Sequence, residues 1–130
     1  MTAGTPRRRT LIDLIPDSLD RFLAADDDRP VTMLNLLRFR PDGGREIYHD
    51  YLALAGPIIE RHGAEIVFTG TGLDPLAAES GQAWDAVALV RYPSRRAFAE
   101  LIADPDFARA NGLRLSALDE AVLQPLVAPD

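Results

Sequence analysis

The chain has 130 residues, 47% of them apolar and 26% charged, a composition typical of one globular domain. A net charge of −6 argues against a broad nucleic-acid interface, and without cysteine there is no disulfide, thiol nucleophile or thiolate metal ligand. No apolar run approaches the roughly 18 residues that span a bilayer, and the N-terminus lacks the apolar stretch of a signal peptide. We expect a cytoplasmic protein with no membrane contact, in which residues 1–10 form a flexible tail and residues 11–130 one domain.

The first predicted helix lies within residues 18–26, SLDRFLAAD, where apolar residues recur at helical spacing. Asp17 or Ser18 is expected to cap it by accepting a hydrogen bond from a free amide. Residues 31–39 then predict a strand whose apolar residues do not alternate with polar ones, so that both of its faces are covered. Such a strand belongs in the centre of a sheet.

The longest predicted helix covers residues 46–62, with apolar and aromatic side chains on one face at spacings of three and four. Pro57 lacks an amide hydrogen, so we expect a kink at Gly56–Pro57 or a helix that restarts there. Gly63 is expected to end the helix in the left-handed conformation. Residues 65–71 predict a second strand.

The second half of the chain repeats this pattern. Residues 83–92 predict a third strand, and helices are expected to begin at the capping residues Ser94 and Asp104. Residues 121–127 predict a last strand, which Pro125 places at the edge of a sheet or at an interrupted ladder.

After the leading helix the predicted order is β-α-β-β-α-β, the α+β ferredoxin-like arrangement with strand order 4-1-3-2. Its helices cover one face of the sheet, whereas residues 31–39 carry apolar side chains on both faces: Met33, Leu37 and Phe39 on one, Leu34 and Leu36 on the other. A second copy packed sheet to sheet would cover the other face and form a dimeric α/β barrel. The alternative is that the leading helix folds over part of that face.

Four segments resemble the uncharacterised bacterial family called domain of unknown function 1330, within the dimeric α/β-barrel superfamily. They are MLNLLRFR at 33–40, YHDYLALAGPIIERHGAEIVFTG at 48–70, ALVRYPSRRAF at 88–98 and DPDFARA at 104–110. The chain departs from the family pattern at Ala64, Tyr92 and Asp106–Phe107. The resemblance implies a homodimer with a cavity between sheet and helices. Relatives in the superfamily include oxygenases that need no metal or flavin, isomerases, dehalogenase-like proteins and binding proteins, so fold analogy does not fix the activity.

Three polar side chains are candidates for a site in such a cavity. Asn35 lies in the most buried predicted strand, where its amide either orients a ligand or bonds to a backbone group or a buried water. Tyr48 and Tyr51 share one helical face and either present hydroxyls to a polar ligand or pack in the core.

Three further residues carry two interpretations each. His62 is either a base that moves a proton or a cation that stabilises a helix C-terminus. Trp84 belongs to the core or the dimer interface, or it lines the pocket. Arg114 binds a carboxylate through its planar fork, or it is a surface arginine.

Metal and cofactor sites are poorly supported by the sequence. His49 and His62 are too far apart on one helix to bind one metal ion together, and no phosphate-loop or serine-nucleophile motif is present. The leading hypothesis is a cofactor-independent oxygenase or isomerase, in which Asn35 and a tyrosine polarise a carbonyl or enolate while His62 moves a proton. The alternative is a ligand-binding or stress-associated homodimer without turnover. An enzyme would hold a base and a polarising donor within about 3 Å of a common ligand position.

Overall fold

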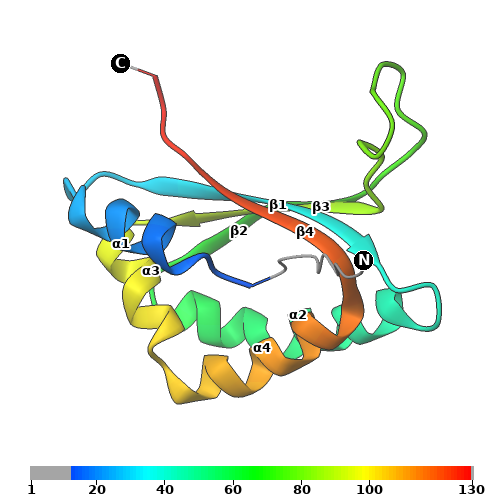
Figure 1. The fold of residues 1–130 in the computed structure, drawn as a ribbon. Helices are drawn as coiled ribbons and strands as arrows, with labels where there is room; N and C mark the ends of the chain where they lie inside the picture. Colours follow the sequence, from blue (N-terminus) through cyan, green and yellow to red (C-terminus); the bar gives the residue numbers. More distant parts are fainter. Residues whose placement is uncertain (1–12, 130) are drawn as a thin grey trace, which may run out of the picture.

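Helices pack on one face of a four-stranded antiparallel sheet in the computed structural model, which describes residues 13–129 (Figure 1). The elements are α1 Pro16–Ala24, β1 Val31–Phe39, α2 Gly44–Arg61, β2 Glu65–Thr71, β3 Ala86–Tyr92, α3 Arg95–Ile102, α4 Pro105–Ala117 and β4 Leu118–Leu126. The predicted tail at residues 1–10 lies outside the described residues.

The sheet has the strand order β2-β3-β1-β4, which confirms the ferredoxin-like prediction with β1 and β3 in the centre. β1 is antiparallel to both of its neighbours, and its register places Asn35 opposite Ala88 of β3 and Leu123 of β4. Asn35 therefore lies at the middle of the sheet.

Two predicted helix starts are confirmed and one is wrong. Ser94 Oγ accepts a hydrogen bond from the Ala97 amide at 3.1 Å, and Asp104 Oδ1 accepts one from the Asp106 amide at 2.9 Å. α1 instead begins at Pro16, with Ile15 in the cap position and no side-chain cap, so neither Asp17 nor Ser18 caps it. Proline suits a first helical position because its missing amide would have had no partner there.

α2 continues through Pro57, so the predicted restart at Gly56–Pro57 is wrong. Proline removes one helical hydrogen bond, but Ala55, Ile58 and Ile59 beside it are all buried in the core. Their packing holds the helix together across the missing bond. Gly63 has φ +84°, which confirms the left-handed end of the helix.

The last two strands begin at different residues from those predicted. β3 starts at Ala86 rather than at residue 83, and β4 starts at Leu118 rather than at residue 121. The register between β1 and β4 shifts at Arg38/Phe39, and Asp85 Oδ2 accepts the Phe39 amide at 2.8 Å. The last pair between β1 and β3 is Leu37 with Ala86, so the Asp85 side chain gives the Phe39 amide a partner beyond the end of that ladder. β4 is an edge strand, as Pro125 predicted.

The two faces of the sheet have different surroundings. Met33 and Leu37 are buried against the helices, whereas Leu34 and Leu36 point to the opposite face and are only partly buried. In Figure 1 the described helices, α1 included, all lie on one side of the sheet. Leu19 and Phe22 of α1 pack against the core cluster, so the alternative in which the leading helix folds over part of the second face is wrong.

Candidate functional site

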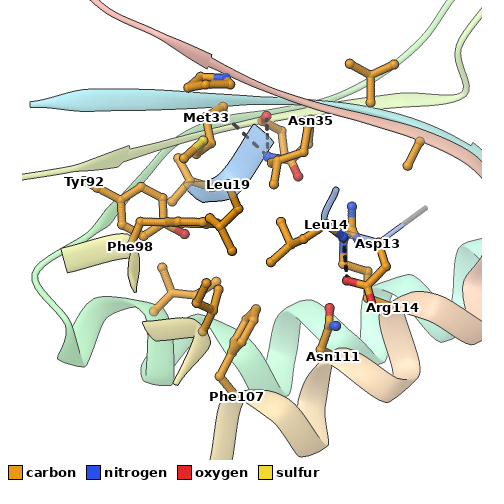
Figure 2. Close-up of a pocket in the computed structure, with 18 of the residues that line it drawn as sticks. Asp13, Leu14, Leu19, Met33, Asn35, Tyr92, Phe98, Phe107, Asn111 and Arg114 are labelled. Atoms are coloured by element: carbon orange, nitrogen blue, oxygen red, sulfur yellow. Dashed lines mark hydrogen bonds between the residues drawn. The ribbon is translucent and has the colours of Figure 1, made fainter. Parts of the chain in front are cut away.

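A cavity of about 550 Å³ lies between the sheet and the helices (Figure 2). This size falls within the range of small-molecule sites, about 300–1,000 Å³. The sheet forms one wall, α2 and α4 form the opposite wall, and α1 with the residues before it contributes Leu14, Leu19 and Phe22. Most lining residues are apolar, and a few polar side chains converge on the same space.

Asn35 lines this cavity and is 8% exposed. Its Nδ2 donates to the Ala88 carbonyl oxygen at 3.3 Å, while the Met33 carbonyl oxygen lies at the limiting distance of 3.5 Å (Figure 2). The two alternatives for Asn35 are therefore not exclusive, because the side chain bonds to the backbone and borders the cavity. These bonds fix the amide plane, so the side chain is held in one orientation.

All three tyrosines of the chain line the cavity: Tyr48 and Tyr51 from α2, and Tyr92 from β3. The rings of Tyr48 and Tyr51 lie 5.3 Å apart, centroid to centroid. Burial raises the pKa of each of the three hydroxyls above its ordinary value, while the nearby Arg114 charge acts in the opposite direction. The three hydroxyls therefore stay protonated near neutral pH and remain hydrogen-bond donors.

Arg114 is a buried residue of the cavity wall, with 8% exposure, so the surface interpretation is wrong. It projects from α4 together with Asn111, which lies three residues earlier on the same helical face and also lines the cavity. The charge of Arg114 acts on the hydroxyls of all three tyrosines, two of which come from α2 and one from β3. Arg114 therefore supplies a permanent positive charge to a cavity whose lining is mostly apolar.

His62 does not line the cavity, contrary to the prediction that groups it with Asn35 and the tyrosines. It follows the last residue of α2, and its Nε2 lies 2.8 Å from Asp104 Oδ2. Arg61 Nη2 donates to the same oxygen at 2.7 Å. The pKa of Asp104 is held well below its usual range, first by the hydrogen bond to His62 and then by the bond to Arg61. His62 thus joins the end of α2 to the start of α4.

Trp84 is also outside the cavity lining. It lies in the loop before β3 and is not one of the helix-facing residues of that strand. The Arg38 guanidinium lies 4.7 Å from the centre of its ring, in cation–π contact. Arg38 also bonds to Glu120 and to the backbone of Ala83 and Gly81. This cluster holds the loop before β3 against the sheet.

Four polar lining residues were not among the sequence candidates for the site: Asp13, Ser18, Tyr92 and Asn111. The strand pattern placed Tyr92 on one face with Ala88, and Asn111 is one helical turn before Arg114. The sequence thus indicated the face on which each of these two residues lies. Only the packing of α4 against α2, and of both helices beneath the sheet, brings the two side chains to the same cavity. Within residues 13–129, no cluster of three or more histidine or acidic side chains is arranged to hold a metal ion. No helix in that range is both long and apolar enough to cross a membrane.

Comparison with protein families finds one match, to the model described as domain of unknown function (DUF1330), over residues 43–124. No curated protein matches the chain. A solved protein of unknown function from Rhodopseudomonas palustris is 33% identical, with a TM-score of 0.85, over 93% of this chain and 100% of that one.

Two more distant solved structures share the fold. A dimeric ferredoxin-like protein of unknown function from Jannaschia sp. CCS1 is 13% identical, with a TM-score of 0.61, over 76% of this chain and 99% of that one. The hydroxynitrile lyase from Passiflora edulis is also 13% identical, with a TM-score of 0.64, over 79% of this chain and 96% of that one. At this identity the likeness concerns architecture and carries no activity to this chain.

Proposed function

The chain belongs to the family of domain of unknown function 1330, and from its fold and cavity we propose that it is a homodimer that binds a small organic molecule between sheet and helices. One observation carries the proposal: a cavity of about 550 Å³ that the core side chains leave open and that buried polar groups border. A cavity of this kind costs stability unless a ligand fills it, because its lining loses packing contacts. A cysteine-free composition is compatible with the expected cytoplasmic location.

Binding is favoured over turnover by the positions of the ionisable groups. Among the described lining residues these are Asp13, Arg114 and the three tyrosines, and no histidine is present. The tyrosines remain protonated, so they serve as donors and not as bases near neutral pH. His62, to which the oxygenase or isomerase mechanism assigns the proton transfer, is not among the described lining residues, and Asp13 is the one carboxylate there.

A ligand screen by thermal shift tests this proposal, with a cavity-filling variant as the specificity control. Ala108 of α4 lines the cavity and is exposed at its rim, so Ala108→Phe is expected to weaken every hit. Ser116→Phe places the same ring on an exposed position of α4 outside the lining and is expected to leave the hits unchanged. Hits that bind both variants equally well would contradict binding in this cavity.

The homodimer is supported by the uncovered face of the sheet. Leu34, Leu36, Val87 and Leu89 form an apolar patch across the two central strands on the face opposite the helices. The Jannaschia structure and a ferredoxin-like structure from Bacteroides fragilis are both described as dimeric. Packing the two patches together would cover this surface in both copies by twofold symmetry.

A further inference from the structure

Three polar side chains, among them the charged groups of the cavity lining, lie together at one end. Figure 2 shows Asp13, Asn111 and Arg114 on one side of the space, and Tyr92 and Phe98 on the other. Towards the second end the lining is aliphatic and aromatic, with Met33 of the sheet and Phe98 of α3, and Phe107 of α4 lies between the two ends. The cavity is therefore amphiphilic, and a ligand that fills it needs one polar end and one apolar body.

Arg114 determines the chemistry of the polar end. It is the one basic residue among the described lining residues, and its side chain is almost completely buried. A guanidinium has five donors in a planar fork, so it can bind a ligand in addition to the contacts that the protein gives it. Carboxylates match this fork with two parallel hydrogen bonds, and such charge-assisted bonds are strong where the local dielectric is low.

The surrounding groups favour a singly charged anion. Asn111 offers amide donors beside Arg114, and the protonated tyrosines offer hydroxyl donors. Asp13, the one acidic residue among the described lining residues, places a negative charge on the same side of the cavity. Arg114 is the one cation among the described lining residues, so the second charge of a phosphate monoester would meet no further cation there and would lie near the Asp13 carboxylate.

We propose that the ligand is an organic monocarboxylate, with its carboxylate bound by Arg114 and Asn111 and its hydrocarbon body directed towards Phe98 and Met33. This inference rests on the proposed binding function and specifies the ligand class of the same cavity. It also assigns Arg114 as the residue that determines selectivity.

Isothermal titration of the full chain near neutral pH tests the proposal with pairs of probes that differ in charge alone. The pairs are octanoate with octanamide and hydrocinnamate with hydrocinnamamide, and phenethyl phosphate is the doubly charged comparison. At least one carboxylate is expected to bind about 10-fold or more tightly than its amide, the scale of one charge-assisted hydrogen bond. It is also expected to bind more tightly than the phosphate ester.

Two substitutions on α4 connect the preference to Arg114. Arg114→Gln is expected to remove most of the difference between carboxylate and amide, whereas Arg109→Gln, on an exposed arginine outside the lining, is expected to retain it. Circular dichroism establishes whether each variant folds. If Arg114→Gln does not fold, the paired probes on the unmodified protein still decide whether the ligand is a monocarboxylate.

Each result separates the ligand class from the proposed function. Equal binding of acids and amides, or a preference for the phosphate ester, would overturn the monocarboxylate and leave the binding function intact. Binding of neither acids nor amides, together with an empty thermal-shift screen, would overturn both. A carboxylate preference that survives in folded Arg114→Gln would overturn the role of Arg114.

Discussion

At the scale of single residues, Asp104 connects two helices that are distant in sequence. Its Oδ1 caps α4 through the Asp106 amide, while its Oδ2 contacts His62 and Arg61 at the end of α2. One carboxylate thus bonds to a free amide at the start of α4 and to the side chains of His62 and Arg61 at the end of α2. This use of His62 explains why the histidine is directed away from the cavity.

The bonds of Asp104 predict how stability depends on pH. Its pKa is lowered in the folded state, so the ionised carboxylate stabilises the fold above the ordinary aspartate pKa of about 3.9, and this contribution is lost as the pH falls below it. Asparagine retains the capping oxygen but has no charge to lose. Asp104→Asn is therefore expected to reduce the loss of stability on acidification below about pH 5, measured by urea unfolding at a series of pH values.

A suitable comparison is Asp74→Asn, which removes an acidic charge from the exposed loop between β2 and β3. It is expected to leave the pH dependence close to that of the unmodified protein. If Asp104→Asn lost as much stability on acidification as the unmodified protein, the contacts of Asp104 would not contribute to acid sensitivity.

At the scale of elements, α2 shows how one glycine determines helix packing. Gly44 is buried at the start of α2, and a Cβ placed there would lie 2.4 Å from the Ala117 carbonyl oxygen at the end of α4. The same oxygen accepts the Arg40 amide at 2.9 Å, so it is held in place by the turn after β1. The close approach of α2 to the end of α4 therefore requires a residue without a side chain.

Substitution of two helical glycines, one in α2 and one in α4, is expected to have opposite effects. Gly44→Ala should destabilise the protein by about 1–3 kcal/mol, because the backbone must shift to relieve the contact. A Cβ at Gly112 of α4 meets nothing within 4 Å, and Gly112→Ala should stabilise the protein by about 0.5–1 kcal/mol through helix propensity. Urea unfolding of both variants provides the free energies, and equal effects would contradict the close packing at Gly44.

At the scale of the whole molecule, the uncovered face of the sheet is the main unexplained surface of the single chain. Phe68 lies on the same face at 55% exposure, since its neighbour in register is Leu89. The loop between β2 and β3 rises on this side of the sheet in Figure 1, and its Leu73 and Leu76 are 88% and 104% exposed. Apolar side chains exposed at these positions are typical of a surface that a partner covers, which supports the proposed dimer.

A charge placed on this face is expected to separate the two copies. Leu89 is central in the patch, and Leu89→Arg would bury a cation against its symmetry mate in the dimer. We expect dimers of the unmodified protein and monomers of Leu89→Arg at micromolar concentration, as measured by sedimentation velocity. Leu54→Arg, on the exposed face of α2, should remain dimeric. Monomers of the unmodified protein would contradict the assembly.

The sequence alone determined the order of the elements, the strand order of the sheet and the burial of β1 on its helix-facing side. These features follow from local periodicity, caps and turns, and they agree with one topology. Asn35, Tyr48 and Tyr51 lie at the cavity wall, because a strand or helix with a known inner face specifies where its side chains point, and their roles there stay predictions.

Only the tertiary structure decided which candidates meet. Arg114 and Asn111 join the tyrosines because α4 packs beside α2, whereas His62 and Trp84 are directed to Asp104 and Arg38. The end of a helix and the loop before a strand have no periodicity that assigns a side chain to one surface. Their partners lie more than 40 residues away in sequence, so packing and electrostatics between elements determine those contacts.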